Sequence, residues 1–245
     1  MGRVVGFETL GYIGWAKKWA DAPIRIISDN IGKVTFPLLS RVQESKEKIR
    51  DFEEKILRYQ TAIVAPVLIG MASVMSLFVE IIPRYQKWEP AIPLFYIFAL
   101  SSLIVSFAIP FMNLYNAQGR VKVTFSFMIF FTALTWILTP FLVSKNPLFG
   151  FPLAHLIVST SMLAIIFKAK KETGLKFFQS VYKFAVASFA MGFVVWFIQK
   201  LVVNVSLPLL FGLSVFLGAV LYYFILRFSF GVNLVSDFKS FYQKK

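Results

Sequence analysis

Long apolar runs separated by short polar turns are the feature that most constrains this fold. Seven such runs follow one another, at residues 11–40, 57–82, 90–117, 121–143, 151–167, 177–203 and 207–228. Each is close to or longer than the ~20 residues with which an α-helix crosses the hydrocarbon core of a bilayer. The pattern predicts an all-α fold: a polytopic membrane helical bundle of about seven transmembrane helices, in a single domain over residues 1–245.

The composition excludes several other classes of protein. Hydrophobic residues make up 58% of the 245 positions, more than a soluble domain of this length could bury. The net charge of +14 would suggest nucleic acid in a soluble protein, but here it fits cationic loops held against anionic membrane lipid. There is no cysteine and the one histidine is His155, so the sequence predicts no disulfide, thiolate or multi-histidine metal site, and no cofactor.

The basic residues between the apolar runs predict the orientation. Alternate connections and the C-terminal tail carry fifteen Lys and Arg residues: Arg41, Lys46, Lys48, Arg50, Lys55, Arg58, Arg120, Lys122, Lys168, Lys170, Lys171, Lys176, Lys239, Lys244 and Lys245. The opposite connections carry four: Arg84, Lys87, Lys145 and Lys200. The positive-inside rule therefore predicts a multi-pass protein of the cell (plasma or inner) membrane with a cytoplasmic C-terminus.

The first run, residues 11–40, differs from the others because it is charged. Five ionisable residues recur in it at four-residue spacing: Lys17, Asp21, Arg25, Asp29 and Lys33. On a helix this spacing forms one stripe that drifts slowly around the axis. A charge that faces lipid is costly, so we expect the stripe to line a wet cavity or a protein interior.

Two simpler interpretations of the same run stay open. The run could be an amphipathic helix that lies flat on the membrane surface. The charges could also neutralise one another, Lys17 with Asp21 and Asp29 with Lys33. Pro23 removes one backbone donor in either case and predicts a kink.

The segment 41–58 is the most polar part of the chain. Opposite charges stand four residues apart in it, and Ile49, Phe52 and Ile56 recur at helical spacing. We interpret the segment as a short amphipathic connector on the cytoplasmic surface, with its charges on a solvated face.

No catalytic motif is present in the sequence. There is no phosphate-binding loop, and Gly11 and Gly14 lack the third glycine and the preceding strand of a dinucleotide site. His155 near the start of its run, and Glu80 near the end of its run, are more simply interfacial residues than proton sites. The residues by themselves therefore identify no catalytic chemistry.

Three short motifs carry a resemblance to a known family. They are Gly11-Tyr12-x-x-x-Ala16, then Phe36-Pro37-x-x-Ser40-Arg41, and, after the charged segment and one further run, Asn116-Ala117-Gln118-Gly119-Arg120-Val121-Lys122. In this order they resemble the second half of polysaccharide flippases (O-antigen or lipid-linked oligosaccharide translocases) of the multidrug/oligosaccharidyl-lipid/polysaccharide exporter superfamily. The resemblance implies the C-terminal lobe of a fourteen-helix transporter, whose N-terminal lobe is then missing. An odd number of spans, with an outside start and no signal sequence, also predicts a longer parent protein.

The resemblance further implies a substrate and a site. Such flippases translocate an isoprenoid-pyrophosphate-linked oligosaccharide for cell-surface polysaccharide biosynthesis, by alternating access to a cationic cavity between two lobes. Because guanidinium and ammonium groups attract a pyrophosphate, Lys17, Lys18 and Arg25 are the expected substrate-binding residues. Asp21, Asp29 and Lys33 are the expected charge partners that line the same cavity.

Three alternatives remain open. A drug or cation antiporter of the same superfamily would need a buried acid, for which Asp21, Asp29 and Glu80 are candidates. A membrane glycosyltransferase or ligase would need large outer loops with catalytic residues, and the outer connections here are short. A non-catalytic membrane subunit is the third alternative.

Overall fold

The computed structural model describes residues 6–41, 45–202 and 205–232, apart from the side chains at positions 28, 29, 31 and 33–41. The described elements are α2 (Phe7–Arg41), α3 (Lys46–Ile81), η1 (Gln86–Ala91), α4 (Ile92–Ala117), α5 (Val121–Lys145), α6 (Gly150–Ser161), α7 (Leu163–Thr173), α8 (Phe177–Leu201), α9 (Leu207–Phe224) and η2 (Ile225–Ser229). No strand occurs in these ranges. The predicted all-α fold is confirmed.

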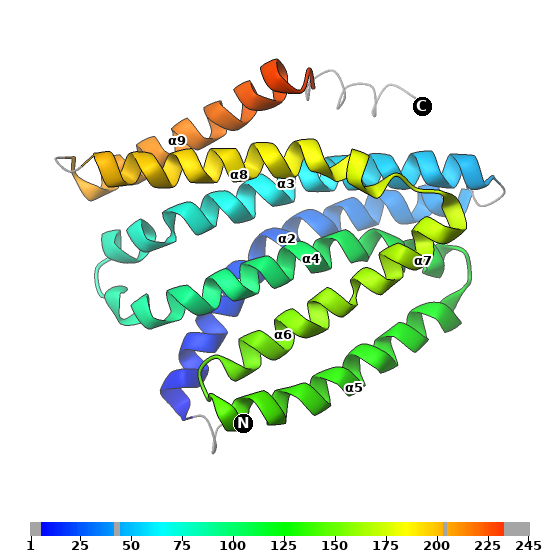
Figure 1. The fold of residues 1–245 in the computed structure, drawn as a ribbon, viewed down its shortest axis with the longest axis horizontal. Helices are drawn as coiled ribbons and strands as arrows, with labels where there is room; N and C mark the ends of the chain where they lie inside the picture. The colour runs from blue at the N-terminus through cyan, green and yellow to red at the C-terminus, as the bar shows by residue number, and fades with distance from the viewer. Residues whose placement is uncertain (1–5, 42–44, 203–204, 233–245) are drawn as a thin grey trace.

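The helices form a bundle in which the long helices run back and forth between two ends (Figure 1). Helices α2, α4 and α7 finish at one end, and α3, α5 and α8 finish at the other. Six helical segments within the described ranges are long and apolar enough to span a membrane: Lys46–Ile81, Gln86–Ala117, Val121–Lys145, Gly150–Thr173, Phe177–Leu201 and Leu207–Ser229. With the 35-residue helix α2, they make the predicted membrane helical bundle.

Several expected boundaries shift. The expected connector 41–58 is not a separate element, because Lys46–Ile81 is one continuous helix that begins at an N-cap, where Ser45 accepts a hydrogen bond from the amide of Lys48. The expected helix over 151–167 is divided at Met162 into α6 and α7. Helix α2 changes direction along its length, as expected for a helix that contains Pro23 (Figure 1).

The two most extensive helix contacts in the bundle are those of α3 with α8 and of α2 with α4. Gly192 on α8 lies so close to α3 that a Cβ atom there would come within 2.5 Å of Cγ2 of Ile69. Small residues permit this approach, as in other membrane helix pairs. The turn between α4 and α5 contains Gly119 at φ +70°, a backbone conformation that favours glycine.

The start of α2 is fixed by an aromatic cluster. Trp15 stacks on Trp88 of η1 with ring centroids 5.7 Å apart, and Tyr12 meets the same ring edge-on. Trp19 packs edge-on against Phe78 of α3 at 5.0 Å. These contacts set the rotation of α2 about its axis, and so decide which of its charges face the bundle.

A polar cluster between α2, α4 and α6

The inner face of α2 is apolar and small, which brings its backbone close to α4. Ile13, Ala16, Ala20 and Ile24 are buried in one core cluster with residues of α3 and α4. Lys17 and Asp21 lie at the border of this face, each about one-third exposed in its side chain, at 35% and 31%. The packing of the neighbouring alanines therefore holds two charged residues against the adjacent helices.

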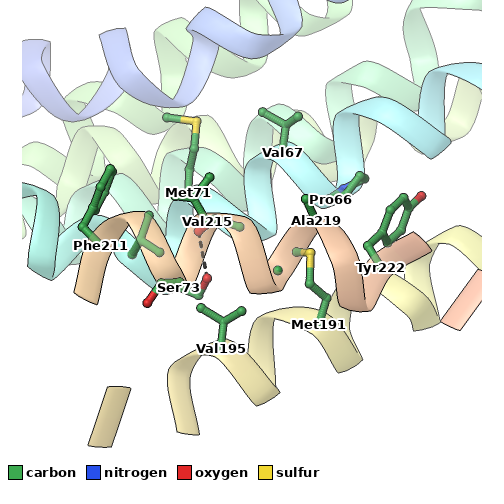
Figure 2. A pocket seen from close by; sticks show the side chains of 14 residues that line it. Pro66, Val67, Met71, Ser73, Met191, Val195, Phe211, Val215, Ala219 and Tyr222 are labelled. Carbon is green, nitrogen blue, oxygen red and sulfur yellow. Dashed lines mark hydrogen bonds between the residues drawn. The ribbon is translucent and has the colours of Figure 1, made fainter. Parts of the chain in front are cut away.

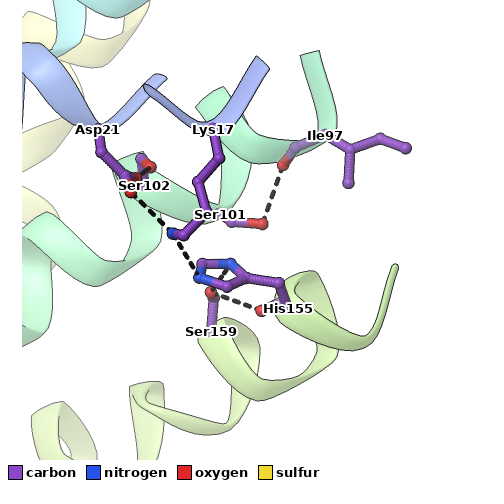
Figure 3. A network of polar contacts seen from close by, with 7 residues as sticks. All are labelled: Lys17, Asp21, Ile97, Ser101, Ser102, His155 and Ser159. Atoms are coloured by element: carbon purple, nitrogen blue, oxygen red, sulfur yellow. Dashed lines mark hydrogen bonds and ion pairs between the residues drawn. The ribbon is translucent and has the colours of Figure 1, made fainter. Parts of the chain in front are cut away.

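Lys17 and Asp21 form the centre of a polar cluster (Figure 3). The Lys17 Nζ atom lies 2.7 Å from Oδ2 of Asp21, one turn later on the same helix. The hydroxyl of Ser102 on α4 donates to Oδ1 of Asp21 at 2.8 Å. Both carboxylate oxygens are thus occupied, as a partly buried acid requires.

His155 on α6 completes the cluster (Figure 3). Its Nε2 atom lies 3.2 Å from Nζ of Lys17, and because an ammonium group only donates, Nε2 accepts and the ring is neutral. The ring also meets Phe98 edge-on, and Lys17 lies 5.6 Å from the centre of the Phe98 ring. One lysine therefore joins α2 to both α4 and α6.

The predicted charged stripe is divided by the fold. Lys17 and Asp21 face the neighbouring helices, whereas Lys18 and Arg25 are exposed. Lys18 and Arg25 are seven residues apart and share a face with Gly14, which is also exposed. The side chains of Asp29 and Lys33 lie outside the described residues.

Asp21 and Lys17 have their partners within this chain, on α4 and α6. One expectation changes at this point. His155 is half-buried and bonded to Lys17, and is not simply an interfacial residue. The sequence carries no signal for this pairing, because 138 positions separate Lys17 from His155. Glu80 is exposed, as expected for an interfacial residue.

A second feature is an apolar groove of about 460 Å³ between α3, α8 and α9 (Figure 2). Its wall includes Val67, Met71, Met191 and Phe211. Gly70 and Gly218 also line it, and a Cβ atom at either position would come within 3.5 Å of a side chain of α8. A groove with this lining suits a hydrocarbon chain.

No group of three or more His, Cys, Asp or Glu residues that could hold a metal ion occurs within the described part of the chain. The chemistry that the described side chains offer is binding by charge and hydrogen bonds.

The fold and the polar cluster define a multi-pass helical membrane protein, and comparisons with known proteins narrow the class. A family model described as "Polysaccharide biosynthesis protein" matches residues 1–93. The lipopolysaccharide biosynthesis protein WzxC of Escherichia coli (strain K12) is 29% identical over 134 residues, which are 55% of this chain and 27% of that protein. The teichuronic acid biosynthesis protein TuaB of Bacillus subtilis (strain 168) is 25% identical over 125 residues, which are 51% of this chain and 26% of that protein.

A solved structure shows the same fold. The lipid II flippase MurJ, in an inward closed conformation, superposes with a TM-score of 0.76 at 14% identity, over 91% of this chain and 47% of MurJ. The chain thus spans about half the length of MurJ, and its alignments cover about a quarter of each curated relative. Together these matches confirm the predicted resemblance to the polysaccharide flippase superfamily.

Proposed function

We propose that this chain forms the C-terminal lobe of a flippase that moves an isoprenoid-pyrophosphate-linked oligosaccharide from the inner to the outer leaflet of the cell membrane. The names of its relatives support a role in polysaccharide biosynthesis, and the fold shared with about half of MurJ supports a missing N-terminal lobe. In this proposal the two lobes alternate access to a cavity between them. The chain then needs no catalytic group of its own.

The observation that carries the proposal is the exposed cationic face of α2. Lys18 and Arg25 share that face, while the opposite face of the helix is buried against α3 and α4. Two cations on a face that this lobe leaves open would attract a pyrophosphate strongly in a sheltered cavity. Lys17 remains a proposed cavity residue because 35% of its side chain is exposed, with Asp21 as its charge partner. Asp29 and Lys33, on the same helix, remain proposed charge partners of this cavity.

The groove between α3, α8 and α9 suits the other end of such a substrate. Its lining is almost wholly apolar and it runs along membrane helices, so a polyisoprenoid chain could lie there without losing contact with lipid. The short connections at the predicted outer end, such as residues 82–85 and 146–149, argue against a glycosyltransferase or ligase.

The test is Arg25→Ala in the intact transporter, with Lys18→Ala as a second variant. Because a charge-assisted contact is worth roughly 1.5–3 kcal/mol, each change should weaken substrate binding by about tenfold or more and lower glycan export. Surface glycan is measured at equal amounts of inserted protein. Lys170→Ala, which removes an exposed positive charge from α7, is the matched control and should leave export unchanged. Unchanged export in Arg25→Ala and Lys18→Ala would contradict the proposed site.

A further inference from the structure

Glu53 on α3 is the acidic residue that the sequence did not single out. Only 1% of its surface is exposed, and it is the one buried acid among the residues that the structure describes. Neither of its carboxyl oxygens has a hydrogen-bond partner within the described residues. The segment that contains it was expected to be solvated, and this part of the expectation is wrong.

The surroundings of Glu53 are apolar. Ile49 and Leu57 stand one turn before and one turn after it, on the same face of α3. Ile49 packs with Leu114 of α4, and Leu57 packs in a cluster with Tyr115 of α4. The carboxyl group is therefore enclosed between two apolar contacts of α3 with α4.

The described titratable groups near Glu53 are bonded to other partners. Tyr115 of α4 lies within electrostatic range of Glu53, but its hydroxyl donates to Glu172 of α7. Glu172 also binds Arg120 and Lys168.

The elements on the other sides of α3 offer no described partner either. Glu54 accepts from the backbone amide of Lys176, and Lys183 of α8 donates to the carbonyl of Phe230. On α2, the side chains of Lys33 and Arg41 lie outside the described residues.

A dry carboxylate with no partner is costly, so the group needs a counter-charge. A metal cation would need several oxygen ligands, and no group of three or more His, Cys, Asp or Glu residues that could hold one occurs in the part of the chain that the structure describes. A proton can neutralise the carboxyl group without any further ligand. We propose that Glu53 is a proton-binding site: it carries a proton while α3 and α4 are packed, and it ionises only when water enters between them. The packing of α3 on α4 would then respond to proton concentration, whatever substrate the transporter carries.

The natural absence of cysteine allows a direct test. A single cysteine is placed in the contact by Ile49→Cys, and its alkylation rate is measured against pH in lipid nanodiscs, with and without E53Q. Gln resembles the protonated acid, and the ionisation of the thiol is common to both proteins. The alkylation rate of the protein with Glu53, divided by that of the protein with E53Q, should therefore rise with pH. The rise should be up to about tenfold per pH unit, as Glu53 ionises and the contact opens. E54Q, on the adjacent residue, is the matched control and should behave like the parent.

Two results would overturn the proposal. One is an identical pH response with and without E53Q. The other is closure of the contact by added Na⁺ at fixed pH, which would indicate a metal cation site. If Ile49→Cys fails to fold, the cysteine-free chain still decides the matter by infrared difference spectroscopy. The carbonyl stretch of a protonated carboxyl group should be present in the parent and in E54Q and lost in E53Q, and its absence from the parent would contradict the proposal.

Discussion

The polar cluster around Lys17 and the buried Glu53 show two different ways of placing ionisable groups inside one membrane bundle. Lys17 and Asp21 neutralise each other, and each has a further partner on another helix. Glu53 is more deeply buried and has no hydrogen-bond partner among the described residues. The first arrangement fixes α2 against α4 and α6. The second leaves a contact of α3 with α4 whose stability depends on what neutralises the acid.

The largest expected effect is that of Asp21→Ala, which breaks the paired arrangement. It leaves the Lys17 ammonium beside a histidine and an aromatic ring without its counter-charge. Because the pair is about one-third exposed, we expect a loss of about 2–3 kcal/mol in the free energy of unfolding, measured by denaturant titration in micelles.

The double variant Lys17→Met with Asp21→Leu is its control. Removing both charges should restore most of the lost stability, because no unpaired ion remains. A double variant as unstable as Asp21→Ala would show that the cluster does not act as a charge pair.

A smaller effect of opposite sign is expected for Glu53→Leu. Replacing a dry, unpartnered carboxyl group by an apolar side chain of similar size should raise the free energy of unfolding by about 1–2 kcal/mol at neutral pH. The same denaturant titration measures the change. A loss as large as that of Asp21→Ala would remove the distinction between the two sites.

The smallest effect is expected at an exposed ion pair, which extends the comparison to the surface. Arg120 contacts Glu172 through two nitrogens, at 2.6 and 3.0 Å, and 41% of its side chain is exposed. The Glu172 carboxylate, by accepting these hydrogen bonds, raises the pKa of Arg120 above its ordinary value, so the pair stays charged at physiological pH. Arg120→Lys keeps the charge but loses the paired geometry, and should cost about 0.5 kcal/mol. A loss of stability larger than that of Asp21→Ala would contradict the expected order of the three sites.

Much of the fold was predictable, because lengths of apolar sequence translate directly into membrane helices. The runs at 90–117, 121–143, 177–203 and 207–228 agree with the observed helices to within a few residues. The continuity of α3 from Lys46 was missed, since a polar first half and an apolar second half look like two elements when only hydropathy changes are followed. The order of the family motifs predicted the resemblance that the comparisons bear out.

The site was predicted only in part. Helical spacing placed Lys17 beside Asp21, because that contact is local to one helix. Spacing could not show that Lys17 faces the neighbouring helices while Lys18 and Arg25 are exposed. That difference depends on the rotation of α2, which is set by where Trp15 and Ala16 pack. Spacing also gave no sign of His155, nor of Glu53 among the solvated charges around it.

The sequence by itself determined that this chain is a basic, multi-span helical membrane protein, because those properties follow from composition and from contacts between residues a turn apart. The tertiary structure alone decided which charges are exposed, which are paired across helices, and which acid is buried. Those outcomes depend on how each helix is rotated against its neighbours, and that rotation is set by packing between residues far apart in the chain.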